Sequence, residues 1–205
     1  MIAFAMTVKT RREEYAESTR RALLDAAAER FASAGYAATS IEDVVRAARV
    51  TRGALYHHFS GKQELFEAVF AEVEMAALAR IGEAAGAVDV PWEAFTAGLD
   101  AALDACLDPA YRRIALQEAP TALGLVRWRQ AAEQHSLGVI SEILQRLVAA
   151  GELKPLPVPL LSRVLFATLA EAALAIAEAP DEQVARAQAG ELVHTLLDAL
   201  RLDHS

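Results

Sequence analysis

The stretch that decides the fold is residues 40–66, SIEDVVRAARVTRGALYHHFSGKQELF. Its first part predicts a short helix over residues 41–48, because Ser40 can accept a backbone N–H at the start of that helix. A turn of about three residues follows, and Thr51 is a second capping residue, so we expect another short helix over residues 52–58. The stretch therefore predicts two short helices joined by a tight turn.

The second of these helices divides into a core face and an exposed face. Leu55 and Phe59 lie four residues apart, so both can point into the core. The other faces carry side chains that suit DNA, because Arg can bond a guanine edge in two places and Tyr, His and Lys can bond phosphates. A glycine in the first turn allows close approach to a groove. The residues of this face are Arg52, Gly53, Tyr56 and His57, with Lys62 just beyond the helix.

Outward from this stretch, the chain predicts helices and no strands. Of its 205 residues, 46 are Ala, whereas Gly contributes only 10 and Pro only 7. Ala, Leu, Glu and Arg are strong helix formers, which favours an all-α fold. Apolar periodicity, caps and Pro or Gly boundaries predict nine helices, over about residues 13–34, 41–48, 52–58, 62–86, 91–106, 109–120, 124–151, 160–178 and 181–202.

Charge is distributed unevenly along the chain. The net charge is -8, yet residues 1–66 hold ten basic and eight acidic side chains, and residues 67–205 hold ten basic and twenty acidic ones. The excess of acidic over basic side chains is confined to the second part. Such asymmetry hints at a nucleic-acid-binding end, so we divide the chain into a DNA-binding domain over 1–66 and a second domain over 67–205, with the helix from Lys62 linking them.

Residues 40–66 resemble the helix-turn-helix signature of the TetR/AcrR family of transcriptional regulators. The resemblance covers about residues 13–66, and its most diagnostic part is 55–59 together with Lys62. It implies an all-α homodimer whose three N-terminal helices bind operator DNA. The C-terminal helices would then hold an effector pocket and a dimer interface.

The resemblance also implies roles for single residues. It places Thr51, Arg52 and Gly53 at the bases, Tyr56, His57 and Lys62 at the phosphates or the groove, and Ser40 at the DNA backbone. Arg49 stands where the family usually has Gly; if that position needs a positive φ, Arg costs about 1 kcal/mol more than Gly, and its side chain adds a phosphate contact. His58 fits either a contact or a cation at the helix end, near the C-terminal dipole.

The second part holds candidates for a pocket and for a dimer interface. The pocket candidates, each of which also suits an ordinary core, are Trp92, Phe95, Leu116, Gln117, Leu125, Trp128, Arg129, His135 and Phe166. The last two helices can approach a second copy closely, so we expect a four-helix bundle there. Its predicted residues are Leu165, Thr168, Ala172, Ala175, Leu196, Leu197 and Leu200.

Several classes of protein are disfavoured. Cys106 is the one cysteine, which excludes an intrachain disulfide or a cysteine-based zinc site and favours a reduced cytoplasm. No uncharged apolar run approaches the roughly 18 residues of a membrane helix, and we expect no targeting segment, with Met1 and Met6 as alternative starts. The P-loop, the nucleophile elbow and zinc-spaced His and Glu pairs are missing, so we expect no enzyme, no cofactor and no metal.

Three functions remain. The leading hypothesis is a ligand-responsive transcriptional regulator, a repressor whose dimer places two recognition helices in major grooves roughly 34 Å apart. The alternative is a helical small-molecule carrier or enzyme with a vestigial helix-turn-helix. A third hypothesis is a nucleoid-type DNA binder without an effector, which predicts neither sequence preference nor a cavity.

Overall fold

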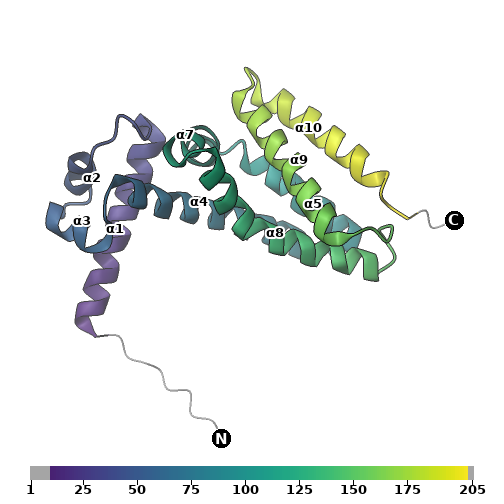
Figure 1. Cartoon of the computed structure of the whole chain (residues 1–205), viewed down its shortest axis with the longest axis horizontal. Helices are drawn as coiled ribbons and strands as arrows, with labels where there is room; N and C mark the ends of the chain where they lie inside the picture. The colour runs from purple at the N-terminus through teal and green to yellow at the C-terminus, as the bar shows by residue number, and fades with distance from the viewer. Residues whose placement is uncertain (1–9, 203–205) are drawn as a thin grey trace, which may run out of the picture. The chain divides into compact units, whose positions relative to one another are not determined.

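The computed structural model describes residues 10–202 and is helical through most of that range (Figure 1). Within it the one β feature is an isolated bridge between Leu153 and Arg201. Met1 and Met6, the alternative starts, lie outside the described residues. The elements are α1 (Arg11–Ala34), α2 (Ile41–Ala47), α3 (Arg52–His58), α4 (Lys62–Gly86), α5 (Pro91–Ala105), α6 (Pro109–Tyr111), the π-helical η1 (Arg112–Glu118), α7 (Ala119–Leu123), α8 (Leu125–Ala149), α9 (Val158–Glu178) and α10 (Glu182–Asp198).

The all-α prediction is confirmed, and local capping explains why the first helices begin where the sequence predicts. Thr10, Ser40 and Thr51 each accept a hydrogen bond from the backbone N–H three residues further on. These bonds satisfy N–H groups that the first turn of a helix leaves without a partner. The helix starts therefore depend on short-range contacts that the sequence shows directly.

Two predicted boundaries are wrong. The last helix ends at Asp198 and not near residue 202. The helix that begins at Pro109 does not stop at Pro120. The helical segment continues through η1 into α7, and α7 ends at Leu123. In the wider π turn the N–H of Ala119 bonds to the carbonyl of Ile114, five residues back. Pro120 then falls in the first turn of α7, where a missing N–H costs nothing.

The chain divides into two compact units, with the boundary between Val69 and Phe70, inside α4. The first unit, which we call the N-terminal unit, holds α1, α2, α3 and the start of α4. The second, the C-terminal unit, holds the rest of α4 and all later helices. The sequence places the boundary after Phe66, in the same helix.

The N-terminal unit packs around aromatic and aliphatic side chains from all four of its helices. Phe31 and Phe66 are fully buried and meet edge to face, with their ring centroids 5.0 Å apart. Leu55 of α3 and Phe59, the residue just after it, are also buried, at 0% and 3% exposure. Their burial confirms the predicted core face of α3, and it fixes which face of that helix remains outside.

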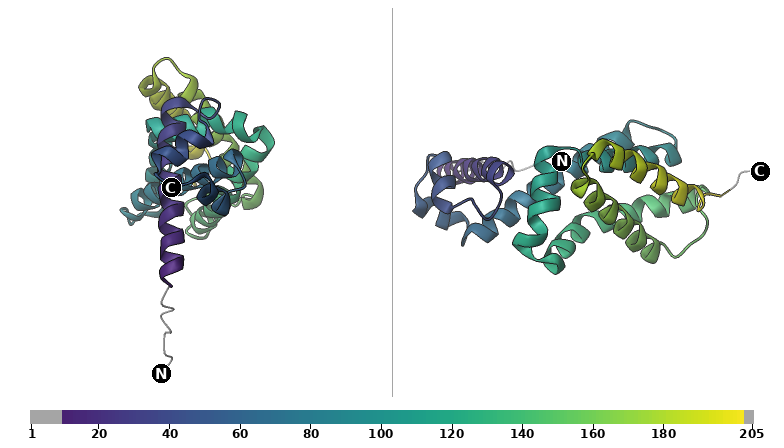
Figure 2. Two further views of the ribbon diagram at one scale, coloured as in Figure 1. Left: turned by 90° about the vertical axis from the view of Figure 1, so that its left-hand side faces the viewer. Right: turned by 90° about the horizontal axis from the view of Figure 1, so that it is seen from above.

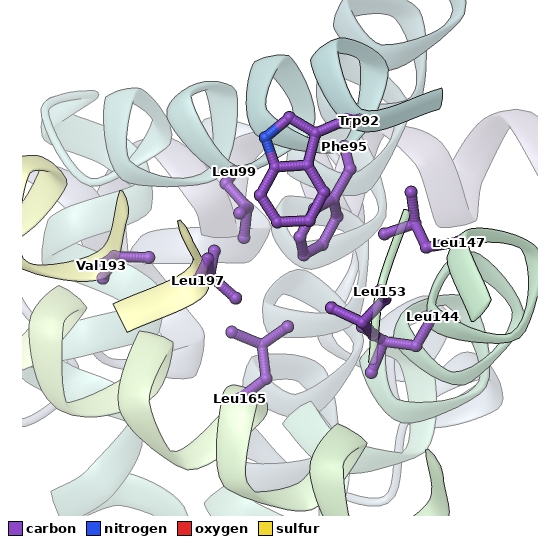
Figure 3. Close-up of a cluster of buried hydrophobic side chains, with 9 residues drawn as sticks. All are labelled: Trp92, Phe95, Leu99, Leu144, Leu147, Leu153, Leu165, Val193 and Leu197. Atoms are coloured by element: carbon purple, nitrogen blue, oxygen red, sulfur yellow. The ribbon is translucent and has the colours of Figure 1, made fainter. Parts of the chain in front are cut away.

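In the C-terminal unit, α9 packs against both α8 and α10, and α9 and α10 lie side by side (Figures 1 and 2). Figure 3 shows one core cluster of this unit, in which side chains from α5, α8, α9 and α10 and from the segment after α8 converge. The cluster consists of Trp92, Phe95, Leu99, Leu144, Leu147, Leu153, Leu165, Val193 and Leu197.

By length and composition α9 could cross a membrane. One such helix is weak support for insertion, since the core helices of globular proteins pass the same test. The packing of α9 against α8 and α10, and the Arg163 and Glu171 side chains within it, fit a helix of the C-terminal unit.

Candidate nucleic-acid interface and ligand cavity

The exposed face of α3 carries the side chains that the sequence predicts. Arg52, Gly53, Tyr56 and His57 are all exposed, whereas Leu55 of the same helix is fully buried. Apart from its chain neighbours and the backbone of its own helix, only the Thr51 hydroxyl among the described residues lies within 4 Å of the place where a side chain at Gly53 would begin. The first turn of α3 is therefore open, with a large cationic side chain beside a bare backbone.

Arg52 is held by two neighbours. Its guanidinium donates to a carboxylate oxygen of Glu42 on α2 at 2.6 Å, and to the hydroxyl of Tyr56 at 3.3 Å. The bond to Tyr56, and then the negative charge of Glu42, raise the pKa of Arg52. The pair is exposed to solvent, so the guanidinium is oriented by Glu42 and a DNA acceptor would have to compete with that carboxylate.

The two helix caps occupy the hydroxyls of Ser40 and Thr51. Ser40 Oγ accepts from the N–H of Asp43 at 3.1 Å and donates to its carboxylate at 2.6 Å. These bonds with Ser40 lower the pKa of Asp43. Thr51 Oγ1 accepts from the N–H of Ala54 at 3.1 Å. Both residues thus position the starts of α2 and α3, whatever else they contact.

The structure places Lys62 differently from the prediction. Its ammonium donates to the carbonyl oxygens of Tyr36 at 2.8 Å and of Thr39 at 2.9 Å, with Ala37 at 3.5 Å. It also lies 4.3 Å from the centroid of the Tyr36 ring. An ammonium has three N–H donors, and this loop offers an acceptor for each of them. Lys62 therefore fastens the α1–α2 loop and has little capacity left for a phosphate.

The turn between α2 and α3 contains a residue in the left-handed conformation, which costs a residue with a side chain more than it costs glycine. Arg49 has a φ of 55° and is the one non-glycine residue with positive φ among residues 10–202. Its side chain is exposed. The premise of the prediction is thus confirmed: a residue with a Cβ occupies a left-handed conformation here.

The two histidines at the end of α3 differ in environment. His57 is exposed and His58 is half-buried, with their rings edge to face and 5.2 Å between centroids. Burial, followed by the nearby charges of His57 and Arg20, lowers the pKa of His58. The neutral ring is thus the favoured form at neutral pH, and the alternative of a cation at the helix end is not supported.

The C-terminal unit contains a cavity of about 450 Å³. Its walls come from α4, α5, α8 and α9, with contributions from α6 and η1, and most of the lining side chains are apolar. Six of the nine predicted pocket residues line it: Phe95, Leu116, Leu125, Trp128, Arg129 and Phe166. A cavity of this size is in the range of small-molecule sites.

Of the other three predicted pocket residues, two do not line the cavity and the third is not described. Trp92 belongs to the core cluster of Figure 3, with the Arg201 guanidinium 4.9 Å from the centre of its ring. Gln117 donates from its amide to the carbonyl of Ala177 at 3.2 Å. His135 falls within α8, but its side chain lies outside what the structure describes.

Sequence reasoning missed the most unusual residue of the cavity, Glu74. It lines the cavity and is only 6% exposed. Its position in the sequence could have revealed it. Phe66, Phe70 and Ala77 follow one another at intervals of four and seven residues on one face of α4, and all three are buried. A carboxylate at the position between Phe70 and Ala77 breaks that apolar stripe.

The predicted dimer face needs correction. Leu165 and Leu197 are 5% and 4% exposed and point into the core cluster in Figure 3. They cannot offer a surface, because the fold of one chain already covers them. Of the other predicted residues, Ala175 and Leu196 are exposed, and Thr168, Ala172 and Leu200 are half-buried. The apolar side chains that do lie outside on α9 and α10 are Leu160, Val164, Val184, Leu192 and Leu196, each at least half exposed.

A helix-turn-helix face in one unit and an apolar cavity in the other define a DNA-binding regulator that responds to a ligand. Residues 23–69 match the family described as "Bacterial regulatory proteins, tetR family", and residues 92–200 match the "Tetracyclin repressor-like, C-terminal domain". The chain belongs to the TetR family of bacterial transcriptional regulators.

Individual relatives agree with this assignment. A TetR-family transcriptional regulator from Pectobacterium atrosepticum has a solved structure that is 31% identical, with a TM-score of 0.85 over 95% of this chain and 99% of that chain. The HTH-type transcriptional regulator SrpR of Pseudomonas putida is 32% identical over 143 residues, 67% of this chain and 65% of SrpR. The Transposon Tn10 TetC protein of Escherichia coli is 28% identical over 149 residues, 73% of this chain and 75% of that protein.

These likenesses support a ligand-responsive DNA-binding repressor. They do not favour the alternative of a helical carrier or enzyme with a vestigial helix-turn-helix. The cavity of about 450 Å³ also counts against a nucleoid-type binder without an effector, since that hypothesis predicts no cavity.

Proposed function

We propose that this protein is a cytoplasmic repressor that binds its operator as a homodimer and releases it when a small molecule occupies the cavity. The observation that carries the proposal is the continuity of α4. Its first residues belong to the N-terminal unit, and its residues from Glu74 to Ala85 line the cavity of the C-terminal unit. A ligand that favours one position of α4 would change operator affinity by its differential affinity for the two states.

The proposed DNA interface is the exposed face of α3 with its flanks. Arg52 would read a base edge, and Gly53 would let the backbone approach the groove. Thr51 would lie with Arg52 and Gly53 on the base-facing side. Phosphates would be met by exposed groups beside them, namely Arg49, Tyr56 and His57, and by the cap Ser40. Lys62 is assigned to the support of this surface, because its ammonium is bonded to loop carbonyls.

Arg52→Ala tests the recognition role. We expect the preference for the operator over random DNA to fall about 10- to 100-fold, since one bidentate pair to a base is worth about 1–3 kcal/mol of discrimination. Fluorescence anisotropy with the DNA upstream of the gene, at two salt concentrations, measures both affinities.

Arg146→Ala is the matched control for that experiment. Arg146 is also exposed and also pairs with a glutamate, Glu142, at 2.5 Å, but it lies on α8 of the C-terminal unit. Its loss should leave the preference unchanged. An unchanged preference in Arg52→Ala would remove Arg52 from the recognition site.

Arg49 allows backbone and side-chain effects to be separated. Arg49→Gly should stabilise the N-terminal unit by about 1 kcal/mol relative to Arg49→Ala, because only glycine adopts a φ of 55° without a steric cost. Both variants lose the same cation, so operator affinity should fall equally in both. Urea unfolding and anisotropy measure the two quantities; equal stabilities would show that the turn carries no strain.

The proposed dimer interface is the exposed apolar face of α9 and α10. Leu160 and Val164 lie one turn apart on α9, and Leu192 and Leu196 lie one turn apart on α10. Exposed leucines and valines aligned on two adjacent helices form a contiguous apolar surface, which a soluble protein normally covers. A two-fold axis would pack this face on its own copy as a four-helix bundle.

A further inference from the structure

The cavity is unusual because a buried acidic side chain, Glu74, lines it. Among residues 10–202, three polar or charged residues are buried: Thr39, Ser162 and Glu74. The first two are accounted for by the fold, because each donates its hydroxyl hydrogen to a backbone carbonyl at 2.8 Å. Glu74 is the one acid of the three, and an apolar side chain at its position in α4 would cost the fold less than a carboxylate does.

Three hydrogen-bond donors of the cavity wall are already used by the protein. The Tyr111 hydroxyl donates to Glu74, the Trp128 indole N–H to the carbonyl of Ala115 at 3.0 Å, and the Cys106 thiol to the carbonyl of Ala102 at 3.5 Å. A ligand that needed donors, such as a carboxylate or a phosphate, would find these three occupied.

The basic and acidic side chains of the cavity wall differ in burial. Among the side chains that the structure describes, Arg129 is the basic one that lines the cavity; it is exposed and pairs with Glu133 at 3.6 Å. Glu74 is buried inside, and Glu171, which also lines the cavity, is exposed. The negative charge is therefore in the interior, where screening is weak, and the positive charge is at the rim.

The charge of Glu74 affects the pKa values of two neighbouring side chains, Cys106 and Tyr111. Burial, and then the charge of Glu74, raise the pKa of Cys106 to about 12 and the pKa of Tyr111 well above its ordinary value. Both groups stay protonated at neutral pH, so neither adds charge of its own. The remaining walls are apolar and include the aromatic side chains of Phe95, Trp128 and Phe166, whose rings attract cations.

We infer that the effector is a lipophilic organic cation whose positive group pairs with the buried Glu74 carboxylate while its apolar body fills the cavity. The inference rests on the proposed function, since it names the ligand class of the same cavity. A protonated amine would add a hydrogen bond to the carboxylate, whereas a quaternary cation would rely on charge and on the aromatic walls.

Two pairs of probes, each a cation and an anion of similar shape, test which sign of charge the cavity prefers in a ligand. Tetraphenylphosphonium and tetraphenylborate share a rigid shape, and decyltrimethylammonium and decyl sulfate, below their micelle concentrations, share a flexible chain. We expect calorimetry on the full-length protein to show at least tenfold tighter binding of the cation in one pair or both. Equal affinities, tighter binding of the anion, or no binding of either cation would overturn the inference without any variant being made.

Glu74→Gln tests the residue. It keeps the size of the side chain and should weaken the preferred cation at least tenfold while leaving its anionic partner unchanged or bound more tightly. Glu142→Gln is the matched control, since Glu142 is an exposed carboxylate of α8 that does not line the cavity; it should not change cation affinity. A cation affinity that survives Glu74→Gln would assign the preference to another group.

Operator binding is measured on the same wild-type sample. Binding of the operator without any preference for cations would refute the inference and leave the proposed function standing. Cation binding without operator binding would refute the proposed function, and only the preference of the cavity for cations would remain.

Discussion

Replacing Leu192 and Leu196 of α10 by glutamate is expected to convert the proposed dimer to a monomer and to lower operator affinity about a hundredfold or more. These leucines are 59% and 50% exposed and occupy one face of α10. In a two-fold interface each substitution enters twice, so four carboxylates would have to be buried without partners, at a cost of several kcal/mol each. A monomer would also lose the gain in affinity from binding two half-sites together, which is of order 10²–10⁴.

Light scattering after size exclusion gives the oligomeric state, and anisotropy gives the operator affinity. Val126→Glu is the matched control, because Val126 is an apolar residue of α8 that is 73% exposed and lies outside the proposed interface. It should leave the dimer intact. A dimer that persists in the double variant would place the interface on another face of the chain.

Replacing Lys62 by methionine is expected to destabilise the N-terminal unit by about 2–4 kcal/mol. The ammonium bonds the carbonyls of Tyr36 and Thr39 at 2.8 and 2.9 Å. Hydrogen bonds to charged groups are worth about 1.5–3 kcal/mol, and a carbonyl left without a partner in a partly buried place adds to the loss. Operator affinity should fall as a consequence, because the loop before α2 loses its anchor.

Chemical unfolding and a salt titration of DNA binding distinguish this role from a phosphate contact. A phosphate contact predicts unchanged stability and a salt dependence reduced by about one charge. Lys154→Met is the matched control: the Lys154 ammonium bonds the carbonyl of Ala199 at 2.6 Å and is exposed. Its loss should cost much less. An unfolding transition equal to wild type in Lys62→Met would return Lys62 to the DNA-contact set.

The parts of the structure that depend on short-range contacts were predictable from the sequence. The start of α2 and the start of α3 follow from Ser40 and Thr51, which bond groups three residues away. The exposed and buried faces of α3 follow from its helical period, which Leu55 and Phe59 reveal. The family resemblance marks Arg49 as costly if its position needs a positive φ, and its φ of 55° meets that condition.

The rest depends on contacts between distant parts of the chain. Lys62 bonds carbonyls that lie 23 and 26 residues earlier, and a positive charge in the sequence does not say whether its partner is a phosphate or a loop. Leu165 and Leu197 belong to helical patterns that fit a core and an interface equally well, and only the packed unit decides between them. Glu74 was overlooked because a single acid in an apolar stripe gains meaning only when the cavity beside it is known.

The ion pair between Glu42 and Arg52 links two positions for anyone who wishes to retarget this regulator. A library that varies only residue 52 would leave the Glu42 carboxylate without its counter-charge on a surface proposed to meet phosphates, and most new side chains would then appear to fail for a reason unrelated to the bases they read. Changing residues 42 and 52 together removes that penalty. If Arg52 reads a base as proposed, the unit of specificity on this surface is a pair of side chains from two helices.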